Sequence, residues 1–121
     1  MPKIAIELTT GDNSLVNVVM ELFSIEVRNG APERRVKHQL GIPVQSGGKF
    51  VFTSQADLPE REYGVWLYVA GSGNSASVSV RDAELVYPEQ PDWPVEVTVP
   101  GTQTKRSRSC YFIPELPGAG S

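Results

Sequence analysis

The residues that could carry chemistry are few, and they do not combine into a catalytic or metal-binding arrangement. The 121-residue chain holds one histidine, His38, and one cysteine, Cys110. Any nucleophile–histidine pair would have to use His38, which lies in the basic stretch 34–38 and is expected in a solvated segment or an edge strand. A zinc site draws mainly on several histidines and cysteines, and this chain has one of each. The sequence therefore predicts no metal, no cofactor and no enzyme activity.

Acidic residues, a glycine-rich turn and a basic cluster each have an ordinary explanation. The 14 acidic residues could supply a carboxylate pair for glycoside hydrolysis, but that number is ordinary for this length. Segment 11–13 together with Asp82 could bind calcium, but it lacks the alternating acidic spacing of a calcium loop, and an Asx turn is the favoured explanation. The glycines at 71–73 lack the lysine of a phosphate-binding loop, and the basic cluster 105–108 is interpreted as a solvated loop. The net charge of −3 argues against nucleic acid as the main partner.

Three aromatic residues are the most informative candidates for binding. Trp66 and Tyr68 lie two residues apart and therefore share one face of an expected strand, whereas Trp93 lies in a proline-rich segment. Exposed planar rings on a β-sheet can stack on pyranose rings or anchor a protein interface. Core packing is the simpler explanation for Trp66 and Tyr68, and Trp93 is expected nearer the surface because loops run there.

The elements that would position these residues are short strands. The chain has 15 valines, 11 glycines and 10 prolines, a composition that suits strands broken by turns. Alternating or apolar runs between turn signals predict strands over 3–9, 15–28, 35–42, 49–54, 62–70, 76–81, 82–87, 95–99 and 109–113. The first half of 15–28 would also fit one or two helical turns beginning at Ser14. This pattern predicts a single all-β domain over 1–121, an antiparallel β-sandwich, with the jelly roll as its expected form.

The cysteine count and the hydropathy of the sequence indicate the cellular compartment in which such a domain is expected to function. One cysteine allows no internal disulfide, which favours a reducing compartment or an assembly that supplies stability in another way. The first residues carry no apolar stretch of the signal-peptide kind, and no segment is apolar for long enough to cross a bilayer. We therefore expect no membrane partner.

Segment 48–87 carries a weak family resemblance. It reads GKFVFTSQADLPEREYGVWLYVAGSGNSASVSVRDAELVY, a strand, then a hairpin with a Gly/Ser turn, then a further strand. This order of strands and turns covers about a third of the chain. It resembles jelly rolls of carbohydrate-binding modules. It also resembles the capsid cement, or decoration, proteins and the tail appendages of tailed bacteriophages. The resemblance implies a virion protein at the capsid surface, made in the host cytoplasm, that clamps neighbouring subunits of a major shell protein and copies of itself. The alternative it implies is a sugar-binding domain.

The shell-clamping hypothesis assigns the contacts to extended arms at about 1–10 and 109–121. Apolar arm residues would be buried in neighbouring subunits, and strands would add to sheet edges. The residues expected to bind the partner are Ile4, Ile6, Trp93, Tyr111, Phe112, Pro114, Leu116 and Pro117. The sugar-binding alternative uses Trp66, Tyr68 or Trp93.

Overall fold

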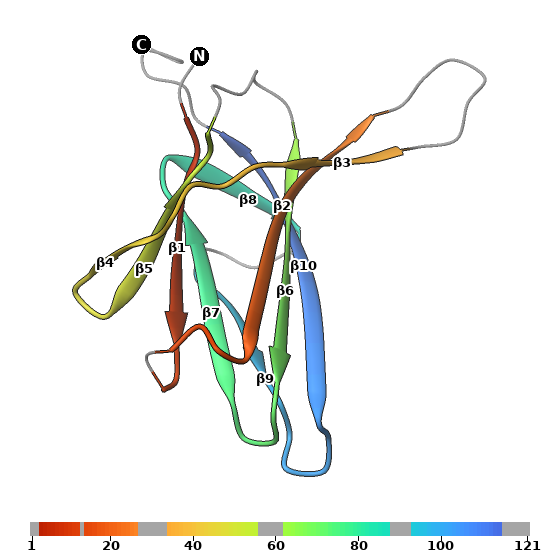
Figure 1. Ribbon diagram of the computed structural model, residues 1–121. Coiled ribbons are helices and arrows are strands. Elements are labelled where there is room, and N and C mark those ends of the chain that lie inside the picture. Colours follow the sequence, from red (N-terminus) through yellow and green to blue (C-terminus); the bar gives the residue numbers. More distant parts are fainter. Residues whose placement is uncertain (1–2, 13, 27–33, 56–61, 88–92, 115–121) are drawn as a thin grey trace.

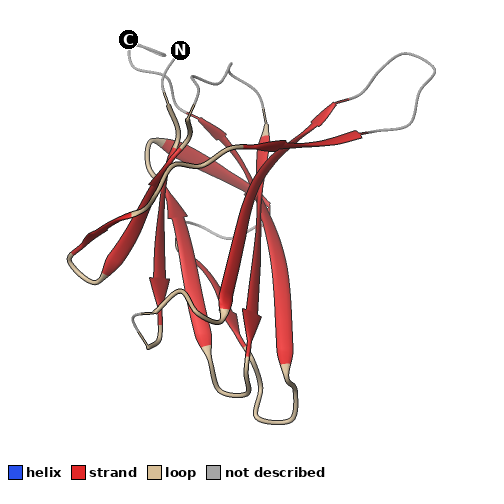
Figure 2. Cartoon of the chain, in the orientation of Figure 1, coloured by secondary structure: helices blue, strands red, loops and turns tan. Residues whose placement is uncertain are grey.

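A computed structural model describes residues 3–12, 14–26, 34–55, 62–87 and 93–114 as two layers of strands (Figures 1 and 2). These residues form no helix and ten strands: β1 (Ala5–Thr10), β2 (Val18–Glu26), β3 (Arg34–His38), β4 (Val44–Ser46), β5 (Lys49–Thr53), β6 (Tyr63–Ala70), β7 (Ser75–Val80), β8 (Ala83–Tyr87), β9 (Val95–Thr98) and β10 (Lys105–Pro114). One sheet has the order β4-β5-β1-β7-β9 and the other has the order β3-β2-β6-β10-β8, with antiparallel pairing throughout. The predicted antiparallel β-sandwich is confirmed, and the jelly-roll form stays a prediction.

Local signals explain most strand boundaries. The strand expected from residue 15 begins at Val18, because residues 15–17 form a turn in which the Val18 N–H donates to the Leu15 carbonyl at 3.3 Å. Gly47 and Gly48 both have positive φ angles and close a two-residue hairpin between β4 and β5. Strand β4 itself was not predicted, because its three residues show no clear alternation.

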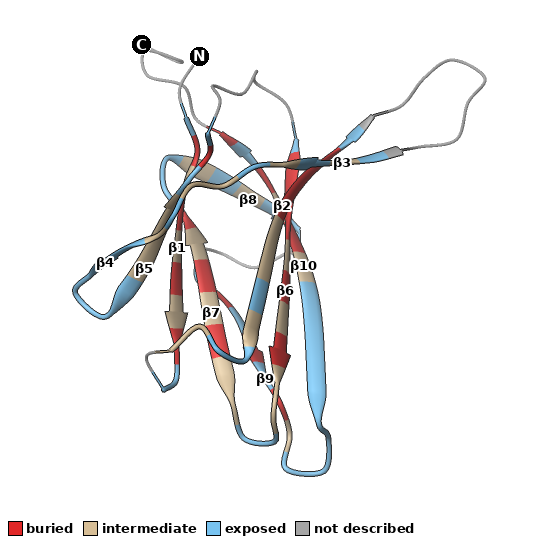
Figure 3. Ribbon diagram, viewed as in Figure 1, coloured by how far each residue is buried: buried red, intermediate tan, exposed pale blue. Residues whose placement is uncertain are grey.

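The core lies between the two sheets, and its buried residues alternate along the central strands β1, β6, β7 and β9 (Figure 3). Sheet packing requires one apolar face per sheet, and period-two patterning supplies it. The largest fully buried side chains of this core are Ile6, Leu8, Leu22, Tyr63, Val65, Leu67, Val69, Val78, Val95, Val97 and Phe112.

Two segments interpreted as arms are strands of this sandwich. Residues 5–10 form β1, which pairs with both β5 and β7 in the middle of its sheet. Residues 109–113 belong to β10, which pairs with β6 on one side and with β8 on the other. The arm interpretation is therefore wrong for these residues, because each segment finds its apolar partners in its own chain. The rest of the C-terminal arm, 115–121, lies outside the described residues.

The outward side of the sheet that contains β1 is polar. Glu7 accepts a hydrogen bond from Arg81 Nε at 2.7 Å and one from Lys49 Nζ at 3.4 Å. The hydrogen bond from Arg81 holds the pKa of the Glu7 carboxyl below its ordinary value, and Lys49 adds to this effect. On the same side, Thr9 of β1 lies opposite Ser77 of β7, and Glu7 lies opposite Ser79. This side of the sandwich is suited to water.

Two arginines cover the edge of the same sheet. Arg106 and Arg108 on β10 donate from Nη1 to the carbonyl oxygens of Thr98 and Glu96 on β9, at 3.4 and 3.2 Å. An edge strand with unpaired backbone groups can pair with another chain, and charged side chains that bind those groups oppose this. Strand β9 is therefore blocked as a pairing surface.

Candidate functional site

The outward side of the sheet β3-β2-β6-β10-β8 differs sharply from the polar side of the other sheet. Strand β6 directs Tyr63, Val65, Leu67 and Val69 into the core, so the residues between them point away from it. Pairing registers place residues of β2 and β10 on the same side as those outward residues. We call this side the aromatic face, and its aromatic residues are Phe23, Trp66, Tyr68, Tyr87 and Tyr111.

Trp66 and Tyr68 form the centre of the aromatic face. Their rings are stacked, with centroids 5.6 Å apart and planes inclined by 29°, and both residues remain half-buried. The core packing expected for them is wrong, because both faces of β6 are apolar and the other sheet covers only one of them. Three of their four direct cross-strand neighbours offer hydrogen-bonding side chains, Glu21, Ser107 and Ser109, and the fourth is Val19.

An ion pair lies beside the tryptophan. Glu21 on β2 is directly opposite Trp66, and its Oε1 lies 2.9 Å from Lys37 Nζ on the neighbouring strand β3. The Glu21 side chain is 30% exposed and that of Lys37 is 70% exposed. The carboxylate is therefore held in place and is still accessible to a ligand on the ring pair.

A second aromatic cluster lies at the other end of this face. Phe23 extends across Gly64, and its ring meets Tyr111 edge-on with centroids 5.7 Å apart. The Arg35 guanidinium lies 3.8 Å from the centre of the Phe23 ring, in cation–π geometry. Tyr111 also contacts Tyr87, which is 56% exposed. Arg35 and Tyr111 together cover Phe23 so completely that it is 1% exposed.

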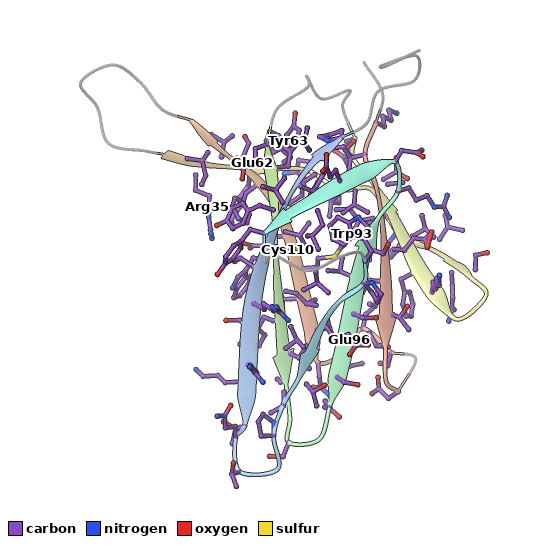
Figure 4. All side chains as sticks on the ribbon, turned by 180° about the vertical axis from the view of Figure 1, so that it is seen from behind. Arg35, Glu62, Tyr63, Trp93, Glu96 and Cys110 are labelled. Carbon is purple, nitrogen blue, oxygen red and sulfur yellow. The ribbon has the colours of Figure 1, made fainter. Side chains whose placement is uncertain are left out.

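Trp93 packs against the border of the core and is only half-buried. Its Nε1 donates to the Ala83 carbonyl at 3.0 Å, and its ring meets Phe112 edge-on with centroids 6.2 Å apart. Figure 4 labels Trp93 and Cys110; Cys110 is buried in the core, and Trp93 is partly buried against it. Trp93 is half-buried at the border of the core, so the sugar or protein contact assigned to it stays a prediction.

The residues assigned to partner binding in the arms are mostly internal. Ile4, Ile6 and Phe112 belong to the core, and Pro114 is buried at the end of β10. Tyr111 is half-buried on the aromatic face, while Leu116 and Pro117 lie outside the described residues. No neighbouring subunit can contact Ile4, Ile6, Phe112 or Pro114 while the sandwich is intact. The assignment of these four residues as partner contacts is therefore wrong.

The contacts of His38 are those of a residue that packs within the sandwich. It ends β3, shares a hydrogen bond of 2.8 Å between its Nε2 and Ser24 Oγ, and meets the Tyr63 ring edge-on. Within the described ranges, no three histidine, cysteine, aspartate or glutamate side chains lie close enough together to hold a metal ion. The histidine therefore contributes to packing between β2, β3 and β6.

The thiol of Cys110 is expected to be unreactive in the folded protein. Cys110 is 1% exposed, as predicted from its apolar surroundings, and burial raises its pKa to about 12. A thiol with that pKa holds almost no thiolate at neutral pH, and thiolate is the reactive form. Reaction with a disulfide reagent should be slow in buffer and rapid in denaturant. Rapid reaction of the native protein would show that β10 opens readily.

No protein-family model, curated protein or solved structure matches the chain. The described part of the chain contains no helix able to span a membrane.

Proposed function

We propose that this protein is a non-catalytic carbohydrate-binding module that holds pyranose rings on the Trp66–Tyr68 pair. The observation that carries the proposal is a stacked, accessible aromatic pair with hydrogen-bonding side chains beside it. A pyranose has an apolar face of C–H groups and a rim of hydroxyls. Ring contacts would remove the apolar face from water, and the polar neighbours would bind the rim.

The two outward sides of the sandwich support this choice of site. The sheet containing β1 presents serines, threonines and the paired charges of Glu7, groups that water solvates well. The aromatic face instead keeps large rings in partial contact with water, which costs free energy until a ligand covers them.

Substitution of either stacked ring should weaken sugar binding. We expect Trp66→Ala and Tyr68→Ala each to lower affinity by roughly tenfold or more, since about 1.4 kcal/mol of lost ring contact has that effect. Titration calorimetry with a panel of neutral hexasaccharides, namely cello-, xylo-, manno- and chito-oligosaccharides, would measure it. Tyr87→Ala is the matched control, because it removes an exposed ring from the same sheet outside the pair.

Two results would contradict the proposal. One is the absence of binding to every sugar of the panel. The other is an equal loss of affinity in the Tyr87→Ala control, which would place the ligand elsewhere. Circular dichroism of each variant separates lost binding from lost folding.

A second candidate function is the structural one, a capsid decoration protein that joins neighbouring shell subunits through the edge strand β4. Its support is the exposure of this edge: Val44 is 67% exposed and Ile42, two residues before it, is 93% exposed. Segment 40–48 contains no charged residue, and among the described strands β4 is an edge strand that pairs only with β5. Strand addition needs an unpaired edge of this kind. Pro43 keeps this edge short. A short edge suits contacts that are individually weak and repeated many times.

The edge hypothesis predicts self-association that a charge abolishes. At high micromolar concentration the protein should sediment as a concentration-dependent mixture, and Val44→Lys should make it monomeric. Val16→Lys is the control, because Val16 is 86% exposed in the turn before β2. A wild-type protein that stays monomeric would count against assembly of this chain with itself through β4.

A further inference from the structure

We infer that Glu21 selects the ligand of the aromatic face and that this ligand is a neutral sugar. The inference rests on the proposed function and adds a substrate class to it. In this assignment the Glu21 carboxylate accepts hydrogen bonds from sugar hydroxyls and repels sugars that carry a carboxylate or a sulfate. Lys37 acts on Glu21 as a positioning residue.

The first support is the location of Glu21. Glu21 on β2 lies directly opposite Trp66 on β6, so the two side chains project from the sheet side by side on the aromatic face. Directly opposed residues have Cβ atoms about 4.5–5.5 Å apart. A sugar ring stacked on Trp66 would therefore bring its hydroxyls within reach of the Glu21 carboxylate.

The second support is unused hydrogen-bonding capacity. Oε1 of Glu21 is paired with Lys37 Nζ, and Oε2 makes no hydrogen bond with any residue that the structure describes. An ionised carboxylate has about four acceptor sites. Adjacent equatorial hydroxyls of a pyranose can donate to such a group together. Ser107 and Ser109 lie on the opposite side of the ring pair and supply hydroxyls to the other rim of the sugar.

The third support is the charge around this position. Lys37 is the cation that faces Glu21 from β3, and its charge is already engaged with that carboxylate. Lys105 is the outward cation of β10, but it pairs with Ala70, four residues along β6 from Trp66, about 13 Å at strand spacing. That exceeds the screening length of about 8 Å at physiological ionic strength. An anionic sugar at Trp66 would therefore meet the Glu21 charge, while the two described cations of β3 on this face are already engaged, Lys37 with Glu21 and Arg35 with the Phe23 ring.

The test compares two ligands that differ at one carbon. The probes are the neutral hexasaccharide that the wild-type protein binds best and its C6-oxidised form, in which each primary alcohol is a carboxylate. Wild-type protein should prefer the neutral form by roughly tenfold or more. Glu21→Gln keeps the shape but removes the charge; it should weaken neutral binding by roughly tenfold and remove most of the preference.

A positioning role for Lys37 has its own signature. Lys37→Met should weaken neutral binding less than Glu21→Gln does, and it should increase the preference against the oxidised sugar, because the Glu21 charge loses its counter-ion. A purely structural role of either residue would lower both affinities by the same factor and leave their ratio unchanged.

The outcomes separate this inference from the function on which it rests. If no sugar binds, or if Trp66→Ala changes nothing, the proposed function fails and the inference fails with it. If sugar binding depends on Trp66 but the ratio of the two affinities is the same in Glu21→Gln and wild type, only the inference is overturned. A wild-type preference for the oxidised sugar would also overturn it.

Discussion

Replacement of Phe112 by alanine is expected to lower the free energy of unfolding by about 3–5 kcal/mol, the usual cost of truncating a buried phenylalanine. Phe112 has no exposed surface, stacks on Tyr63 with centroids 5.9 Å apart and meets Trp93 edge-on. Small domains are stable by about 5–15 kcal/mol, so the variant would lose a large share of its stability. Urea unfolding followed by far-UV circular dichroism would measure the change.

The next residue along the chain supplies the control. Ile113 is 38% exposed on the opposite side of β10, and Ile113→Ala should cost clearly less than Phe112→Ala. The comparison also decides between two interpretations of the C-terminal region. Small and equal effects would mean that residues 109–113 do not stabilise their own sandwich, and the arm hypothesis would regain its support.

Replacement of Gly64 by alanine is expected to destabilise the protein by about 1–3 kcal/mol, the range for overpacking. A Cβ atom at this position would overlap the ring of Phe23, which lies directly on the glycine backbone. The ring cannot move outward without leaving the Arg35 guanidinium and the edge of Tyr111. Thermal unfolding is a suitable measurement, with Gly101→Ala as control, because a Cβ there meets no atom within 4 Å.

A double-mutant cycle identifies the cause of that loss. In a Phe23→Ala background the added methyl group has room, so Gly64→Ala should then cost little. An equal cost in both backgrounds would show that the effect arises from the β6 backbone and not from the ring. The cycle also tests whether the Phe23 ring covers Gly64 on the aromatic face.

The individual strands could be predicted because their signals are local. In 62–70, Tyr63, Val65 and Leu67 alternate with Trp66 and Tyr68, and period two is a property of the strand alone. Gly47 and Gly48 likewise mark a turn that their own backbone freedom allows. The burial of Cys110 followed from the apolar residues beside it. These features made the antiparallel sandwich predictable without any knowledge of which strands pair.

The candidate site could be predicted only in part. Trp66 and Tyr68 were recognised as a pair on one face, but both faces of their strand are apolar, so the sequence alone favoured packing in the core. Glu21 was not recognised at all, because its importance comes from lying opposite Trp66, and that depends on the register between β2 and β6. No pattern within either strand specifies that register.

The amino-acid sequence by itself determined most of the strands, several of their turns and the all-β class, since these follow from backbone preferences and side-chain alternation over a few residues. Only the tertiary structure decided which apolar face the second sheet covers, and that the half-buried Trp93 packs against the buried Phe112. It also decided that residues 5–10 and 109–113 complete the sandwich instead of extending from it. The physical reason is that burial depends on pairing between distant segments, and sheet packing can hide one face of each strand while leaving the other to water or to a ligand.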